Sequence, residues 1–177
     1  HFSVGDDCIA IKSGKIDMAE RFYRPCRDIT IRNCLMEDGH GAIVLGSEIS
    51  SGVVGLVVNN CLFLNTDRGL RIKTRRGRGS KCVIDQVLFE NIKMDHVYNA
   101  FVINMFYKCD SDGLSDYVQS KSWMEVDHRT PLVGEVTFRN IICENTLVSA
   151  GYFYGLPEQK IKQIEFDHVS ITMKQND

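Results

Sequence analysis

The chain has 177 residues, of which 44% are hydrophobic, and carries a formal net charge of −2. This composition predicts a single globular unit, residues 1–177, with a sizeable core. No apolar run approaches the roughly 20 residues that a membrane-spanning helix needs. The near-neutral charge gives no reason to expect nucleic acid as a partner. Membrane and nucleic-acid partners are therefore not expected.

The first informative stretch is Gly5–Gly14, with the sequence GDDCIAIKSG. Its apolar residues alternate with other residues, which indicates that a loop carrying Asp6 and Asp7 enters a half-buried strand that ends near Lys12. Two neighbouring carboxylates suit acid–base catalysis, because one can donate a proton while the other accepts one. A Gly-Asp-Asp sequence alone is more often a turn.

Two later stretches repeat the alternation. Residues 39–48 read GHGAIVLGSE and residues 69–74 read GLRIKT. Glycines on both sides of His40 leave its side chain unobstructed. Arg71 and Lys73 lie on one side of their strand, where a planar fork beside a point charge suits a carboxylate. A structural histidine and a solvated strand face are the alternative interpretations.

A longer repeat runs through the whole chain. Five alternating strands each end in Asn or His followed by an apolar residue, and these anchors are 27, 31, 49 and 28 residues apart. The spacing of 49 indicates an insertion in one coil, at residues 105–131. The anchors are Asn33, Asn60, Asn91, Asn140 and His168.

A second strand follows each anchor at a constant offset. Short strands at a period of 27 to 31, without a convincing amphipathic helix, predict an all-β parallel solenoid of about five coils. A leucine-rich-repeat horseshoe would need a Leu-x-x-Leu-x-Leu pattern, which is absent. The inward columns expected ten and twelve residues past the anchors are Ile43, Leu70, Phe101 and Ala150, and Leu45, Ile72, Ile103 and Tyr152.

Residues at equal offsets stack at about 4.8 Å in successive coils. Asp6 then lies level with His40, Val44 with Arg71, and Lys12 with Lys73. These side chains from three consecutive coils are expected to converge on one outer face. The positive run Arg75–Gly79 either extends this face toward an acidic ligand or is a solvated turn, and the sequence favours neither.

The insertion at residues 105–131 contains Asp110–Gly113, which resembles the start of a calcium loop. Lys121 stands where such a loop needs a bidentate glutamate, so this interpretation fails and no metal site is expected. The insertion also carries aromatic residues that either stack on sugar rings or pack the loop onto the coil. These are Tyr107, Tyr117 and Trp123.

The seven cysteines are an odd number and do not form a disulfide pattern. Cys34 and Cys61 share a column in successive coils. Cys143 lies in another inward column, in which the same register places Phe2 level with Met36, Phe63, Met94, Cys143 and Ile171. Buried free thiols are expected there, and they favour a reducing compartment.

The ordered motifs GDDCIAIKSG, GHGAIVLGSE and RIKT together resemble the polygalacturonases, family 28 of the glycoside hydrolases. This resemblance implies a right-handed parallel β-helix and the inverting hydrolysis of α-1,4-galacturonosyl linkages in polygalacturonate or pectin, by endo or exo action and without a cofactor. It also favours an extracellular location, in conflict with the cysteines, so the compartment stays open.

The resemblance gives each matching residue a role. Asp6 would protonate the glycosidic oxygen, Asp7 would activate water, and His40 would hold Asp6 by a hydrogen bond. The substrate carboxylate would bind Arg71, Lys73 and Lys12.

Inverting enzymes hold their acid and base roughly 6.5 to 9.5 Å apart, so the adjacent pair needs a further carboxylate. The family supplies it in an Asn-Thr-Asp motif one coil upstream of the acid pair. Residues 65–67 have the same letters, but they follow His40, and we interpret them as a turn. The register is cut mid-coil at both ends, so the sequence predicts a piece of a longer protein.

Two alternative functions stay open. A rhamnogalacturonan hydrolase would be close in fold but tends to depart at the positions of His40 and Arg71–Lys73. A non-catalytic carbohydrate-binding β-helix would share the coils without needing the acids, the imidazole and the cations in register.

Overall fold

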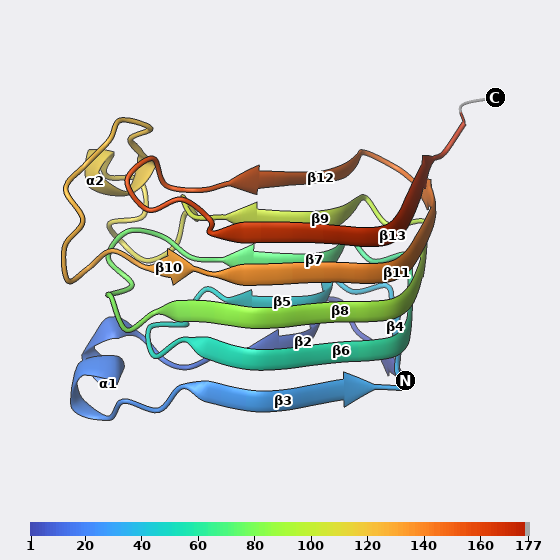
Figure 1. Ribbon diagram of the computed structural model, residues 1–177, viewed down its shortest axis with the longest axis horizontal. Coiled ribbons are helices and arrows are strands. Elements are labelled where there is room, and N and C mark those ends of the chain that lie inside the picture. The colour runs from blue at the N-terminus through green and yellow to red at the C-terminus, as the bar shows by residue number, and fades with distance from the viewer. Residues whose placement is uncertain (176–177) are drawn as a thin grey trace.

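A computed structural model of the chain describes residues 1–175. It is a right-handed parallel β-helix of about 6 turns, as Figure 1 shows, which confirms the predicted all-β solenoid with one turn more than expected. Two sheets form its walls, and every strand pair within them is parallel.

The first sheet has eight strands and the second has five. The first contains β1 (Phe2–Ser3), β3 (Cys26–Arg32), β4 (Leu35–Glu37), β6 (Val53–Leu64), β8 (Val83–Asp95), β10 (Leu132–Val133), β11 (Glu135–Thr146) and β13 (Gln163–Met173). The second contains β2 (Asp7–Ile11), β5 (Gly41–Gly46), β7 (Arg68–Lys73), β9 (Asn99–Asn104) and β12 (Ser149–Tyr154). Two short helices, α1 (Ile16–Arg21) and α2 (Asp116–Gln119), lie outside the sheets.

The predicted anchor residues are the corners of the coils. All five have a left-handed backbone, with φ between 50° and 57°. Asparagine tolerates this conformation better than most residues. The amide of Asn60 donates to Oδ1 of Asn33 at 2.7 Å, and that of Asn140 donates to Oδ1 of Asn91 at 3.1 Å. The sequence repeat therefore marks where each long strand bends.

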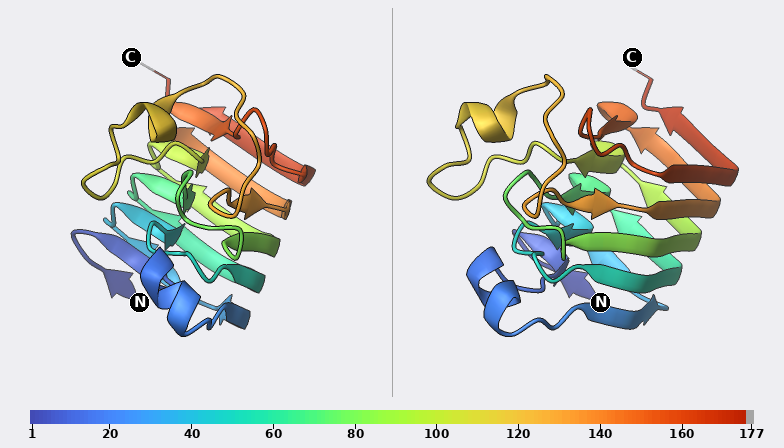
Figure 2. Two further views of the ribbon diagram at one scale, coloured as in Figure 1. Left: turned by 90° about the vertical axis from the view of Figure 1, so that its left-hand side faces the viewer. Right: turned by 60° about the vertical axis from the view of Figure 1, so that its left-hand side comes forward.

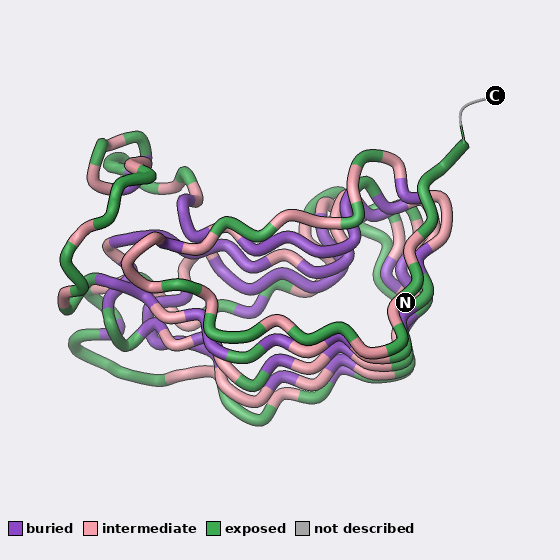
Figure 3. The backbone as a smooth tube through the Cα atoms, turned by 45° about the horizontal axis from the view of Figure 1, so that its top comes forward, coloured by how far each residue is buried: buried purple, intermediate pink, exposed green. Residues whose placement is uncertain are grey.

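The inward columns form a continuous core, visible as stacked purple segments in Figure 3. One predicted column is confirmed along its whole length, because pairing places its members level in successive coils. Its members are Phe2, Met36, Phe63, Met94, Cys143 and Ile171.

The predicted register is wrong by one residue in the last coil of the second sheet. Phe101 pairs with Gly151 rather than with Ala150, and Ile103 pairs with Phe153 rather than with Tyr152. Counted from the paired residues Met94 and Cys143, the last coil has one residue more before the level of Asn99 and Ser149. The backbone N–H groups of residues 148 and 149 both donate to the Tyr98 carbonyl. β11 also shifts its register against β13 by one residue between Cys143 and Thr146, so the extra residue is taken up between Cys143 and β12.

The insertion leaves the coil after β9 and returns at β10, carrying α2 beside the ends of the strands (Figure 2). It is held by arginines of the run at residues 75–79. Arg75 donates to Asp112 at 2.6 Å and to Asp110 at 3.4 Å, and Arg78 pairs with Asp110 at 3.0 Å. Both arginines are buried. Both sequence interpretations of this run, a ligand contact and a solvated turn, are therefore wrong.

Arg76 is the largest fully buried side chain of the fold. Its guanidinium forms two hydrogen bonds with Glu158, of 2.6 and 2.9 Å, and also donates to the main-chain carbonyls of Tyr117 and Ser120. Both partners of the ion pair are 1% exposed. A buried charge needs such complete pairing to offset its desolvation. The ion pair fixes the turn after β7 to the loop after β12, and the two carbonyl contacts hold the insertion against that turn.

All seven cysteines lie within residues 1–175 and are free thiols, as expected. Complete burial raises the pKa of Cys82 to about 12. In the described part of the chain, no helix has the length and apolar character to span a membrane.

Removing the carboxylate of Glu158 should destabilise the fold strongly, because it would leave the Arg76 guanidinium buried without its counter-charge. We expect Glu158→Ala to lower the free energy of unfolding by about 3 to 5 kcal/mol, measured by urea denaturation followed by circular dichroism. The matched control is Glu144→Ala, which removes an exposed ion pair with Lys93 and should cost about 1 kcal/mol or less. Equal effects of the two changes would contradict this account of the buried pair.

Asp110 should make stability depend on pH. The hydrogen bond from Lys15, together with Arg78 and Arg75, lowers its pKa from 3.8 to about 2. Because the folded state binds the proton more weakly than the unfolded chain, the contribution is fully present above pH ~4 and is lost as the pH falls toward 2. Urea titrations across this range should show a smaller acid loss for Asp110→Asn than for the wild type. Parallel curves would exclude Asp110 as a source of the dependence.

Candidate active site

The two acids lie where the chain enters β2. Asp6 is exposed, and its Oδ1 accepts from the backbone N–H of Asp7 at 2.7 Å. The Asp7 side chain is only 10% exposed, and its Oδ2 accepts from Lys73 Nζ at 3.0 Å. The other oxygen, Oδ1, is buried without a hydrogen-bond partner among the described residues. One acid therefore faces solvent, while its neighbour is held by a cation.

The two predicted cations of β7 differ in their surroundings. Lys73 is 8% exposed and is paired with Asp7. Arg71 is half-buried, and its Nη1 has no acceptor in the described part of the chain. The Arg71 guanidinium carbon and the Lys73 Nζ lie 5.4 and 5.5 Å from the ring centroid of Tyr107, within the range of cation–π attraction. Arg71 is the cation that keeps capacity for an anionic ligand.

The structure places Lys12 in an ion pair of its own. Its Nζ lies 2.6 Å from Oε2 of Glu48. The hydrogen bond to Glu48 is the largest cause that raises the Lys12 pKa, and the nearby Asp7 and Asp6 add smaller contributions. Lys12 thus lies within the electrostatic reach of the acids, but its charge is already shared.

His40 lies level with Asp6, as the register predicted, and its backbone N–H donates to the Asp6 carbonyl at 3.0 Å. Its imidazole, however, contacts a different acid from the one expected. Nδ1 lies 2.6 Å from Oδ2 of Asp67, and the same oxygen accepts from Arg68 Nη1 at 3.0 Å. The hydrogen bonds of the described residues include none between the His40 ring and Asp6.

This contact assigns the histidine's proton. A carboxylate can only accept, so the neutral His40 ring carries its proton on Nδ1, and Nε2 is left as the acceptor. Arg68 Nη1 lies 3.2 Å from Nδ1 and 3.4 Å from Nε2, so the guanidinium packs against the ring. Asp67 and Arg68 together fix the orientation of the imidazole.

The glycines beside His40 make room for the acid segment itself. A Cβ on Gly39 would collide with the Cys8 sulfur and approach the Asp6 carbonyl. A Cβ on Gly41 would collide with Val44 and lie 3.3 Å from Asp7 Oδ1. The Gly-His-Gly sequence therefore lets this coil pack closely against the coil that carries both acids.

Sequence reasoning missed Asp67 and Arg68 as parts of this site. Residues 65–67 do form the predicted turn before β7, but the turn also supplies the partner of His40. The signal was available, because Asp67 lies seven residues past Asn60, as His40 lies seven past Asn33.

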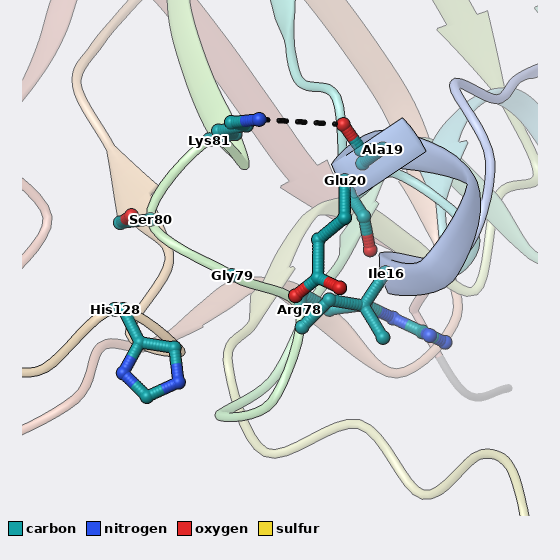
Figure 4. A pocket seen from close by; sticks show the side chains of 9 residues that line it. Ile16, Ala19, Glu20, Arg78, Gly79, Ser80, Lys81 and His128 are labelled. Atoms are coloured by element: carbon teal, nitrogen blue, oxygen red, sulfur yellow. Dashed lines mark hydrogen bonds between the residues drawn. The ribbon is translucent and has the colours of Figure 1, made fainter. Parts of the chain in front are cut away.

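A separate hollow lies between α1 and the turn that follows β7, as Figure 4 shows. Glu20 and His128 project beside it, and Lys81 Nζ donates to the Ala19 carbonyl at 3.5 Å. The predicted site residues are not among those that line it. Within residues 1–175, no group of three or more His, Cys, Asp or Glu side chains could hold a metal ion.

Comparison with known protein families identifies the family of this chain. The family model for glycosyl hydrolases family 28 matches residues 1–177. The chain belongs to this family.

Several members of family 28 are similar to the chain over part of their length. A probable polygalacturonase of Vitis vinifera is 26% identical over 168 residues, which is 94% of this chain and 32% of the relative. A polygalacturonase of Nicotiana tabacum is 39% identical over 119 residues, 63% of this chain and 27% of the relative. The crystal structure of a hyperthermoactive exopolygalacturonase from Thermotoga maritima matches with a TM-score of 0.75 at 26% identity, covering 97% of this chain and 35% of that one. The chain spans about a third of the length of these relatives.

The contact between His40 and Asp67 predicts a measurable tautomer. Nitrogen-15 NMR of the imidazole should show the Nδ1–H form of His40 in the wild type and a mixture richer in the Nε2–H form in Asp67→Ala. The matched control is Asp95→Ala, which removes the carboxylate 2.9 Å from Nδ1 of His96 and should leave the His40 signals unchanged. An Nε2–H tautomer of His40 in the wild type would contradict the assignment.

Proposed function

We propose that this chain is part of a pectin-degrading glycoside hydrolase that cleaves α-1,4-galacturonosyl linkages of polygalacturonate with inversion. The observation that carries the proposal is the group formed by Asp7, Lys73 and Arg71. It joins a buried carboxylate, its cationic partner and a second cation with spare donors beside the exposed Asp6. Membership of family 28 supports it.

In this proposal Asp6 is the general acid. Its exposure leaves the carboxyl free to reach a glycosidic oxygen and donate a proton as the bond breaks. The leaving sugar takes that proton as its hydroxyl, and water attacks the anomeric carbon from the opposite face.

Asp7 accepts a proton from the attacking water. Its Oδ1 is the unpartnered oxygen of the pair, while Lys73 holds Oδ2. An acid and a base of an inverting enzyme stand roughly 6.5 to 9.5 Å apart. The proposal therefore includes a third carboxylate from the upstream coil, which the family resemblance implies and which would share the positioning of the water with Asp7.

Arg71 recognises the substrate's carboxylate. A guanidinium with a free edge binds a planar carboxylate through two hydrogen bonds. Lys73 adds positive charge beside it, but its pairing with Asp7 makes it a positioning group for the acid as well as a substrate contact.

The decisive test is Asp6→Asn in the longer protein that the sequence predicts. Loss of a positioned general acid should lower kcat on polygalacturonate by about 10²- to 10⁴-fold, in a reducing-sugar assay, while oligogalacturonate binding is retained. Asp17→Asn, which changes an exposed carboxylate on α1, is the matched control and should keep full activity.

The products distinguish the proposal from its competitors. Hydrolysis that resists chelation and gives the inverted anomer, seen by proton NMR, supports it. Calcium-dependent unsaturated products would indicate a lyase. Cleavage of rhamnogalacturonan instead of polygalacturonate would identify the related hydrolase, and binding of oligogalacturonate without turnover in the wild type would indicate a binding β-helix.

A further inference from the structure

The thiol of Cys109, in the insertion after β9, has a cationic hydrogen-bond donor. Arg78 Nη2 donates to its Sγ at 2.9 Å. The six other thiols form their hydrogen bonds with main-chain carbonyls or with a threonine hydroxyl. A carbonyl acceptor favours a protonated thiol, whereas a cationic donor favours a thiolate. Within residues 1–175, Cys109 is thus the cysteine whose sulfur accepts from a charged side chain.

Solvent also reaches Cys109, because its side chain is half-buried. Cys8 and Cys26 are half-buried as well, but burial raises the pKa of both thiols. Three other cysteines are buried in the core: Cys61, Cys82 and Cys143. Cys109 therefore combines access to solvent with a cationic neighbour, which are the two properties of reactive cysteines.

The sulfur belongs to an ion-paired cluster that joins the insertion to two other segments. Lys15, before α1, pairs with Asp110 at 2.9 Å, and Arg78, after β7, pairs with the same carboxylate at 3.0 Å. Arg75 donates to Asp112 at 2.6 Å. Three cations thus face two carboxylates, so one positive charge beside the thiol has no counter-charge in the cluster.

The two arginines also keep donors for a further oxygen atom. Arg75 is 4% exposed and Arg78 is 2% exposed, and the Nε atoms of both are buried without an acceptor among the described residues. In a guanidinium, Nε and Nη2 form one edge, so Nε of Arg78 lies on the edge that faces the sulfur. An oxygen bonded to this sulfur would be within reach of a donor that lacks an acceptor.

We propose that Cys109 is a site of oxidation by peroxide, at which the thiolate becomes a sulfenic acid. The thiolate sulfur attacks one oxygen of hydrogen peroxide, and the O–O bond breaks. The sulfur gains the hydroxyl group and is oxidised by two electrons, while the other oxygen leaves as hydroxide and takes up a proton to become water. The guanidinium of Arg78 holds the thiolate before this step and hydrogen-bonds the new oxygen after it.

The test uses the longer protein that the sequence predicts, fully reduced and then exposed to a limiting amount of hydrogen peroxide. Dimedone traps sulfenic acid, and peptide mass spectrometry measures the labelled fraction of each cysteine. At neutral pH, Cys109 should be labelled about 10-fold faster than Cys26, the gain in thiolate content that a cationic neighbour typically gives. Labelling of Cys109 no faster than that of Cys26 would overturn the proposal.

A second variant tests the role of charge. Lys15 is 55% exposed, so Lys15→Gln should fold normally. Loss of one cation from the cluster should slow the labelling of Cys109 about 2-fold, whereas a mere loosening of the insertion would speed it. The matched control is Lys93→Gln, which removes an exposed ion pair with Glu144 and should leave the rate unchanged. A rate in Lys15→Gln equal to or above that of the wild type would contradict the electrostatic basis of the site.

Discussion

Parallel pairing of each coil with the next is the constraint on which the rest of this structure depends. Because the backbone hydrogen bonds repeat in register, a residue's distance from its corner decides which column its side chain joins. The left-handed corners keep that register by bending the chain at the same level in each coil. Asp6, His40 and Asp67 come from three successive coils, and backbone hydrogen bonds join His40 to Asp6 and Asp67 to Gly39.

The charged groups on the outer face divide according to whether they already have partners. Lys73 and Lys12 are engaged by Asp7 and Glu48, whereas Arg71 and Arg68 retain unpaired nitrogens. Solvation explains the pairing of Lys73, since a buried ammonium without a partner would be costly, whereas a guanidinium can satisfy one edge and leave another unpaired. Lys73 thus holds Asp7 in place, Lys12 is paired with Glu48, and the two arginines keep nitrogens without an acceptor among the described residues.

The sequence predicted those features that depend on the period of the coil repeat. The column through Phe2, the column through Ile43 as far as Phe101, and the level of Asp6 with His40 follow from side-chain alternation and a constant offset, and the pairing confirms them. The partner of His40 could not be predicted in this way, because a column fixes where a side chain starts but not which neighbour its ring turns toward.

The interpretations of the arginine run at residues 75–79 were wrong for a different reason. Arg75, Arg76 and Arg78 are paired with Asp110, Asp112 and Glu158, which lie more than thirty residues further along the chain. No local sequence pattern indicates that the insertion after β9 folds back onto the turn after β7. The motifs predicted where the site residues lie, whereas the pairing of the arginines needed the three-dimensional arrangement of the insertion and of the loop after β12.

The extra residue before β12 shows that the two walls of the solenoid are adjusted separately. In the first sheet, residues of β11 pair with residues of β8 that lie 49 positions earlier. In the second sheet, residues of β12 pair with residues of β9 that lie 50 positions earlier. One extra residue thus slides β12 against β9, while β11 keeps its pairing with β8. Such a slide exchanges inward and outward positions in one strand only, so a solenoid of this kind can acquire a new surface residue in one coil without rebuilding the coils below it.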